Sequence, residues 1–207
     1  MPNESPSTEK VSKAHTSRMR RVKEQMDRRM AEASVDRGVF VVNSGDGKGK
    51  SSSGFGMVAR ALGHGMRVGV VQFIKGNSQT GESLFFGRFP EEVSFVVAGE
   101  GFTWETQNRE RDCAVAEAGW DEARKFLRDP SIGLVLLDEL CIALQYRYLS
   151  EDVVIADILK RPVSQHVVVT GRGASPVLMN AADTVTQMMP LKHAFAAGIR
   201  AQRGTEW

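Results

Sequence analysis

A glycine-rich segment, GDGKGKS at residues 45–51, lies between an apolar run and a stretch with helical spacing. Glycines allow backbone N–H groups to turn toward phosphate oxygens, and the first turn of a helix adds a positive end. In this pattern Lys50 reaches the phosphates, and the Ser51 hydroxyl binds Mg²⁺ or Mn²⁺. The sequence therefore predicts a nucleotide-binding site made of Gly45, Asp46, Gly47, Lys48, Gly49, Lys50, Ser51 and Ser52.

One position departs from the strict motif GxxxxGK[ST], which has glycine where this chain has Ser44. The glycine follows one residue later, at Gly45. The alternative interpretation is a glycine-rich turn between a strand and a helix, in which GKS occurs by chance. The order of strand, turn and helix favours a phosphate loop over that alternative.

A second group of candidate residues follows an apolar run, since Asp138 and Glu139 come directly after residues 134–137. This is the Walker B arrangement, in which a buried strand carries acids to the edge of the sheet where the phosphate loop lies. There the carboxylates would hold the metal ion directly or through water. The sequence leaves open which of the two is the direct ligand. An ordinary strand that ends at an acidic turn is the alternative.

The rest of the pattern predicts the elements that must position these groups. Continuous Val and Leu runs are typical of strands buried on both faces, and strands that alternate with helices predict a mostly parallel sheet. We expect an α/β fold of three layers, P-loop NTPase-like (RecA-like), with about six strands and an N-terminal basic helix. The expected strands are 39–44, 67–74, 94–98, 133–139, 166–170 and 184–188, and the expected helices are 10–33, 51–63, 107–128, 140–147 and 151–160.

Charge divides the chain near residue 37. Residues 1–37 hold nine Lys or Arg and six Asp or Glu, whereas the whole chain of 207 residues has a net charge of only +2. We expect a disordered start and a basic helix in residues 1–37, followed by one α/β domain in residues 38–207. Apolar residues at helical spacing, among them Met19, Val22, Met26 and Met30, give this helix a narrow apolar stripe that must pack on something.

Composition excludes several classes of protein. Apolar residues make up 42% and charged residues 25%, as in ordinary globular domains, and the small net charge demands no nucleic-acid partner. No apolar run approaches the roughly 20 residues that span a bilayer, so we expect no membrane partner. The two cysteines, Cys113 and Cys141, form no metal-binding or disulfide pattern, which favours a cytoplasmic location.

Seven short segments carry the interpretation further. They are NSGDGKGKSS (43–52), ARALGHG (59–65), VGVVQFIKG (68–76), GFTWETQNRE (101–110), LLDEL (136–140), VTGRG (169–173) and KHAFAAG (192–198). In this order they resemble the ATP:corrinoid adenosyltransferases, the cob(I)alamin adenosyltransferase family of the P-loop type. The resemblance covers residues 10–207. The family's phosphate loop has the same shifted glycine, which accounts for Gly45.

The resemblance implies an enzyme that transfers the 5′-deoxyadenosyl group of ATP to the Co(I) of a reduced corrinoid and releases triphosphate. Lys50 would then neutralise charge on the leaving group, together with the metal ion. Phe102 and Trp104 match family aromatics that lie under the corrin and displace its lower axial ligand, with core packing as the alternative. Arg60 and Arg172 would contact nucleotide or corrinoid, or else form structural ion pairs.

The resemblance also implies partners. It predicts a homodimer in which the N-terminal helix reaches over the active site of the other subunit, and a flavodoxin or flavoprotein reductase that supplies Co(I). The segment 83–90 and Ala196 depart from the family pattern. A P-loop ATPase, a small-molecule kinase and a non-enzymatic carrier are the alternatives, and the identity of the phosphate product separates them from the transferase.

Overall fold

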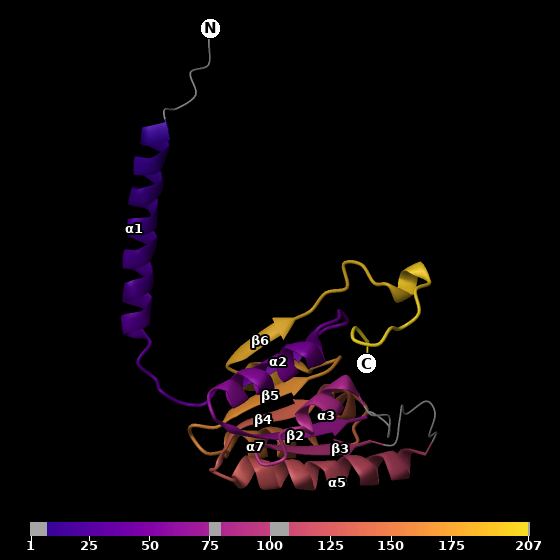
Figure 1. The fold of residues 1–207 in the computed structure, drawn as a ribbon. Helices are drawn as coiled ribbons and strands as arrows, with labels where there is room; N and C mark the ends of the chain where they lie inside the picture. The colour runs from indigo at the N-terminus through magenta and orange to yellow at the C-terminus, as the bar shows by residue number, and fades with distance from the viewer. Residues whose placement is uncertain (1–7, 75–79, 100–107, 207) are drawn as a thin grey trace. The chain divides into compact units, whose positions relative to one another are not determined.

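The computed structural model describes residues 8–74, 80–99 and 108–206. The chain forms two units, residues 1–36 and residues 37–207. The first unit contains one helix, α1 (Thr8–Glu32), and the second contains the sheet and the remaining described helices (Figure 1). None of the helices in the described residues is both long and apolar enough to cross a membrane.

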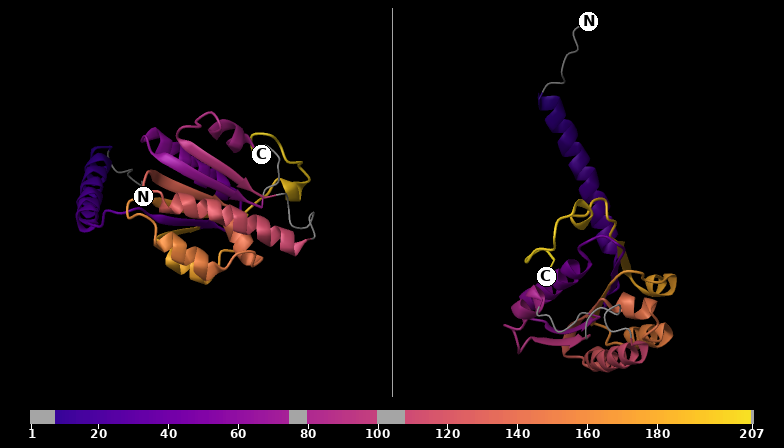
Figure 2. Two further views of the ribbon diagram at one scale, coloured as in Figure 1. Left: turned by 90° about the horizontal axis from the view of Figure 1, so that it is seen from below. Right: turned by 90° about the vertical axis from the view of Figure 1, so that its right-hand side faces the viewer.

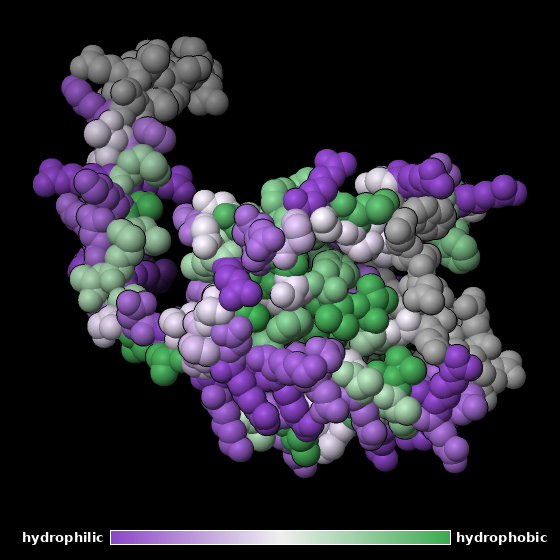
Figure 3. Space-filling model, turned by 60° about the horizontal axis from the view of Figure 1, so that its bottom comes forward, coloured by the Kyte–Doolittle hydropathy of each residue, from purple (hydrophilic) through white to green (hydrophobic). Residues whose placement is uncertain are grey.

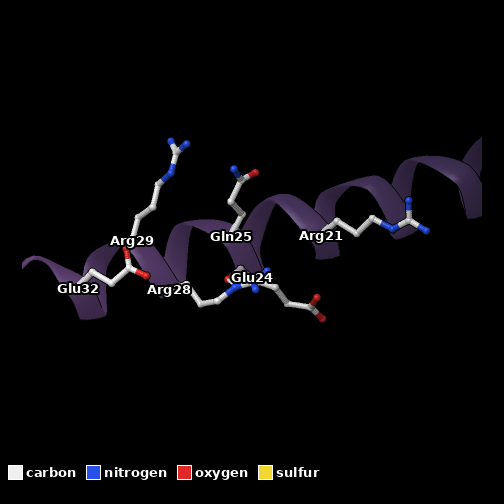
Figure 4. Close-up of a pocket in the computed structure, with 6 residues that line it drawn as sticks. All are labelled: Arg21, Glu24, Gln25, Arg28, Arg29 and Glu32. Carbon is white, nitrogen blue, oxygen red and sulfur yellow. Dashed lines mark hydrogen bonds between the residues drawn. The ribbon is translucent and has the colours of Figure 1, made fainter.

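Helix α1 carries charged side chains along much of its surface. Arg20 and Glu24 form an ion pair one turn apart, with 3.1 Å between Nε and Oε1. Figure 4 shows a shallow concavity along this helix, lined by Arg21, Glu24, Gln25, Arg28, Arg29 and Glu32. The predicted apolar stripe of Met19, Val22, Met26 and Met30 is 43–62% exposed. Within the first unit, the described residues therefore leave this apolar face uncovered.

A six-stranded parallel sheet forms the centre of the second unit, with the strand order β3-β2-β4-β5-β1-β6 (Figure 1). The strands are β1 (Phe40–Ser44), β2 (Arg67–Phe73), β3 (Val93–Ala98), β4 (Ile132–Asp138), β5 (His166–Thr170) and β6 (Thr184–Gln187). Strand β5 lies between β1, which leads into the phosphate loop, and β4, which carries the acids. The carboxyl ends of these three strands therefore meet at one edge of the sheet.

Helices cover both faces of the sheet, as the two views in Figure 2 show. One face is covered by α2 (Lys50–Gly63) and α3 (Gly81–Phe86), and the other by α5 (Arg109–Arg128), α6 (Leu140–Gln145), α7 (Glu151–Leu159) and α8 (Pro176–Ala181). A short 3₁₀ helix, η1 (Phe195–Ala197), follows β6. The three-layer arrangement confirms the predicted fold class.

Two hydrophobic cores, one on each face of the sheet, explain why the strand sequences are continuous runs of apolar residues. In β4, Val135 and Leu137 pack on the side of α5 and α7, whereas Leu134 and Leu136 pack on the side of α2 and α3. Both faces of the strand are therefore buried, as in other parallel sheets. Some apolar surface is still exposed: Figure 3 shows a green area in the middle of one face, bordered by purple hydrophilic side chains.

The predicted elements are confirmed, with boundaries that differ by one or two residues at most ends. Helix α6 ends at Gln145 and not at 147. Helix α5 begins at Arg109, where the Asn108 side chain caps it by accepting a hydrogen bond from the Arg111 N–H. Two short helices, α3 and α8, were not predicted; each has only six residues, so its helical period is weak.

An ion pair beside β1 predicts how stability depends on pH. Arg37 donates to Asp183, and the Phe40 N–H donates to the same carboxylate at 2.8 Å. These contacts, of which the hydrogen bond from Arg37 has the largest effect, lower the pKa of Asp183 to about 2. Because its folded pKa lies below the ordinary 3.8, Asp183 stabilises the fold above about pH 4 and loses that contribution as pH falls toward 2.

We therefore expect the difference in unfolding free energy between wild type and Asp183→Asn to decrease as pH falls over this interval. Urea unfolding at pH 5, 4 and 3 measures it, and a constant gap would contradict the expectation.

Candidate nucleotide site

The segment after β1 turns tightly and leads directly into α2. Gly45 and Gly49 adopt φ angles of 103° and 107°, which favour glycine over other residues. Gly49 is also the N-cap of α2, so the first N–H groups of this helix open beside the loop. The predicted shift of the first glycine from position 44 to 45 thus corresponds to a position where the backbone requires glycine.

Strand β6 holds the loop from one side. The Met188 N–H donates to the Ser44 carbonyl at 2.8 Å, and the Gly47 N–H donates to the Met188 carbonyl at 2.8 Å. A Cβ atom at Gly45 would lie 2.4 Å from that same Met188 carbonyl oxygen. The conformation of the phosphate loop is therefore fixed by the sheet before any ligand binds.

Lys50 lies at the start of α2 and is only 7% exposed. Its Nζ donates to the Gly47 carbonyl at 2.6 Å, so the ammonium group lies inside the loop. Burial lowers the pKa of Lys50, and the nearby cation of Arg172 lowers it further, whereas Glu139 and Asp46 act in the opposite direction. An anion that entered the loop would relieve this electrostatic cost.

The two acids at the end of β4 lie in different surroundings. Asp138 is fully buried, and its carboxyl group accepts hydrogen bonds from Gln72 at 2.8 Å and Thr170 at 2.7 Å. Glu139 adopts a left-handed conformation, with φ 60°, and is the N-cap residue directly before α6. This backbone turn places Glu139, and not Asp138, on the wall of the cavity described next.

A cavity of about 860 Å³ opens beside the phosphate loop, a size typical of small-molecule sites. Its polar lining includes the phosphate-loop residues Lys48, Gly49, Lys50, Ser51 and Ser52, the cation of Arg172, and the acids Glu82, Glu139 and Glu206. Its apolar wall is formed by Ile74, Phe85, Phe86, Ile142 and Tyr146, from α3, α6 and the residue that follows β2. The cavity can thus take a ligand that has both phosphate groups and apolar surface.

The apolar wall is supported from behind. Phe85 contacts Phe86 edge to face, with 5.1 Å between ring centroids, and Phe86 stacks on Phe55 at 5.6 Å. Tyr146 stacks on Tyr148 at 5.7 Å. Such contacts hold the rings in place without a ligand. The wall is therefore preformed on both α3 and α6.

The structure brings together most of the predicted site residues. Lys48, Gly49, Lys50, Ser51, Ser52, Glu139 and Arg172 line one cavity. Asp46 is exposed on the loop, and Gly45 and Gly47 shape it from behind. Arg60 lies exposed in the last turn of α2 and is not among the residues that line the cavity. Phe102 and Trp104 lie outside the described residues.

Sequence reasoning missed three contributions to the cavity. The C-terminal segment supplies Ala201, Gly204, Thr205 and Glu206, and Glu206 forms an ion pair with Lys48. Helix α3 supplies Phe85, and helix α6 supplies Tyr146. The sequence carries no local signal for these residues, because only the fold brings them to the phosphate loop.

Fold and site together define the class of protein. A parallel three-layer sheet, a phosphate loop with a buried lysine, and an acid on the cavity wall are the features of a P-loop nucleotide-binding protein.

Comparison with known proteins defines the family. The model of the ATP:corrinoid adenosyltransferase family BtuR/CobO/CobP matches residues 36–207. A corrinoid adenosyltransferase from Pseudomonas aeruginosa is 62% identical to this chain over 99% of this chain and 100% of its own length. Corrinoid adenosyltransferase CobA from Salmonella typhimurium is 46% identical over 92% and 96%, and a corrinoid adenosyltransferase from Sinorhizobium sp. is 45% identical over 96% and 94%. The chain belongs to the ATP:corrinoid adenosyltransferase family.

This membership confirms the predicted resemblance and the predicted type of enzyme. The chain is a transferase of cobalamin biosynthesis that uses ATP to adenosylate corrinoids. The alternatives of a P-loop ATPase, a kinase or a carrier have no support from these matches.

Proposed function

We propose that the cavity binds ATP with its triphosphate in the loop and directs C5′ of the ribose toward the Co(I) of a reduced corrinoid. The electron pair of Co(I) forms the Co–C bond, the C5′–O bond breaks, and its electrons leave with triphosphate. The observation that carries this proposal is that one cavity is lined both by the phosphate loop with its buried Lys50 and by the apolar wall.

Lys50 acts in this proposal on the leaving group. Its ammonium group is already inside the loop, so little reorganisation is needed when charge develops on the departing triphosphate. Arg172, on the same cavity, adds a second cation. The attacking atom belongs to the corrinoid, and therefore the protein has to orient the substrates and exclude water, but supplies no nucleophile of its own.

We also propose that Mg²⁺ accompanies ATP. The donor set fits, because a hydroxyl from Ser51 and a carboxylate from Glu139 line the cavity, and oxygen donors are what Mg²⁺ prefers. Bound there with the nucleotide, Mg²⁺ would supply positive charge to the triphosphate. Asp138, which lies behind the wall and accepts two hydrogen bonds, would support Glu139 without binding the ion.

The remaining roles are proposed from the family resemblance. Phe102 and Trp104 would occupy the lower face of the corrin, where large apolar rings exclude water and offer cobalt no donor atom. Arg60 would contact nucleotide or corrinoid only after a rearrangement or from another subunit, since it does not line the cavity.

Assembly and location complete the proposal, and experiments can test them directly. We propose a homodimer in which the exposed stripe of α1 packs on the other subunit, because exposed methionines and valines gain free energy from burial. Deletion of residues 1–37 with no change in corrinoid affinity would count against it. A flavodoxin or flavoprotein would supply the electrons that reduce the corrinoid to Co(I). We also propose a cytoplasmic location, since Cys113 and Cys141 are free thiols, as is usual in a reducing compartment.

The reaction itself is tested by product identity. The protein is incubated anaerobically with MgATP and chemically reduced cobalamin, the visible spectrum is followed, and the phosphate products are separated. We expect a light-sensitive Co–C product and one triphosphate per adenosyl group transferred. Release of ADP and orthophosphate with no change in the corrinoid spectrum would overturn the proposal and favour an ATPase or kinase.

A further inference from the structure

A row of buried polar side chains crosses the carboxyl edge of the sheet. Gln72 of β2 is the register partner of Asp138 of β4, and Thr170 of β5 is the register partner of Asn43 of β1. All four are at most 2% exposed. Polar groups are rarely placed in such a layer unless hydrogen bonds satisfy them, so the direction of each bond is informative.

Thr170 has the central place in this row. Its hydroxyl donates to Oδ1 of Asp138 at 2.7 Å and accepts from the backbone N–H of Glu139 at 3.0 Å. A hydroxyl has one hydrogen and two lone pairs. Because the hydrogen is directed to Asp138, a lone pair faces Glu139. One oxygen atom thus links the buried acid to the acid on the cavity wall.

Glu139 needs such a link because its backbone is strained. It is a non-glycine residue at φ 60° and ψ 17°, a conformation that the surrounding structure must enforce. The neighbouring strand also leaves room for the helix that follows Glu139, since Gly171 comes directly after Thr170 and a Cβ atom there would lie 2.8 Å from Cβ of Cys141 in α6. The turn at Glu139 is what directs its side chain into the cavity and not along the strand.

We propose that Thr170 is a positioning residue, whose hydroxyl holds the left-handed backbone of Glu139 and thereby sets the Glu139 carboxylate against the metal–nucleotide. The inference rests on the proposed role of Glu139 in binding Mg²⁺. Gln72 has a different part: it donates to Oδ2 of Asp138 at 2.8 Å but does not act on Glu139 directly. Gln72 therefore supplies a matched control.

The test compares Thr170→Val, Thr170→Ser and Gln72→Leu in the full chain. Thr170→Val and Gln72→Leu each remove one hydrogen-bond donor from Asp138, but only Thr170→Val also removes the acceptor of the Glu139 N–H. ATP binding is measured by calorimetry with and without Mg²⁺, and activity is measured against Mg²⁺ concentration. Melting temperatures report the structural cost that the two variants share.

For Thr170→Val we expect a 10- to 100-fold rise in the Mg²⁺ concentration for half-maximal activity, on the order of the effects seen when partners of metal ligands are removed. Mg²⁺ should no longer tighten ATP binding, whereas binding without Mg²⁺ should change by less than about 3-fold. Thr170→Ser keeps the hydroxyl and should restore both properties. Gln72→Leu should lower the melting temperature without altering the Mg²⁺ dependence.

Two outcomes would overturn the inference. One is an equal shift in Mg²⁺ dependence for Thr170→Val and Gln72→Leu, which would assign both residues a structural role. The other is an unchanged Mg²⁺ dependence in Thr170→Val. If the valine variant does not fold, Thr170→Ala, which leaves room for water, carries the same comparison. A wild-type protein whose ATP binding ignores Mg²⁺ would instead contradict the proposed metal site itself.

Discussion

Replacement of Lys50 by methionine is expected to lower kcat/KM for ATP by about 10³-fold, since a single preorganised charge donor is worth about 10²–10³ in comparable sites. Lys50 is 7% exposed and already donates to the Gly47 carbonyl, so the ammonium group needs no rearrangement to face the triphosphate. Methionine keeps the aliphatic length of the side chain but removes both the charge and the hydrogen bond to the Gly47 carbonyl. Initial rates of adenosylcobalamin formation at varied ATP concentrations measure the effect.

Stability should move in the opposite direction to activity in the same variant. Burial lowers the pKa of Lys50, and so the charged form is less favourable in the folded protein than in the unfolded chain. Removing that charge should leave the melting temperature at pH 7 unchanged or raised. This cost of the buried charge in wild type is full at neutral pH, decreases once pH rises past the lowered pKa of folded Lys50, and is gone above the ordinary lysine pKa of 10.5.

Lys48→Met is the matched control for Lys50→Met. Lys48 belongs to the same loop but is exposed, and it pairs with Glu206 of the C-terminal segment. Exposed ion pairs contribute little, so we expect a fall in kcat/KM of at most about 10-fold. Equal losses in the two variants would mean that charge anywhere on the loop is enough. More than a tenth of wild-type kcat/KM in Lys50→Met would refute the proposed role of that residue.

The sheet and the phosphate loop could be predicted because their signals are local. The apolar run at 134–137 contributes to both cores, which only a strand buried on both faces requires. Gly45 and Gly49 have positive φ angles that few other residues adopt, so the glycine pattern itself encodes the turn. These features depend on neighbours in sequence and on little else.

The remaining walls of the cavity could not be predicted because they depend on tertiary structure. Phe85 and Tyr146 lie far apart in sequence and contribute to one wall only after α3 and α6 pack on opposite faces of the sheet. Glu206 reaches Lys48 through a segment without regular periodicity. For Arg60 the sequence left a ligand contact and a structural ion pair open, and the fold places this residue in the last turn of α2, away from the residues that line the cavity.

The choice between Asp138 and Glu139 also lay beyond the sequence. Adjacent residues on a strand point to opposite faces, so either acid could have faced the loop. In the structure Glu139 has a left-handed backbone and lines the cavity, and its N–H donates to the Thr170 hydroxyl of the neighbouring strand. If Thr170 holds this turn as proposed, a contact between strands that are distant in sequence determines which acid lines the cavity.

Glu139→Gln and Asp138→Asn are expected to separate activity from stability. Glu139 lines the cavity, so its replacement by the neutral isostere should lower kcat by at least about 10²-fold at fixed Mg²⁺, comparable to the loss of an electrostatic group from other active sites. The melting temperature of the Glu139→Gln variant should fall little. Excess Mg²⁺ should recover part of the rate if the missing carboxylate is a metal ligand.

Asp138→Asn should show the reverse pattern, with stability affected before chemistry. The buried carboxyl group accepts from both Gln72 and Thr170, and the amide nitrogen of asparagine would face one of these donors without accepting from it. Leaving a buried donor unsatisfied costs about 1–3 kcal/mol, which urea unfolding can resolve. If Asp138→Asn instead abolished activity in a fully stable protein while Glu139→Gln remained active, the metal would belong to Asp138. Because the two residues are adjacent and the substitutions are isosteric, this pair of measurements assigns the ligand directly.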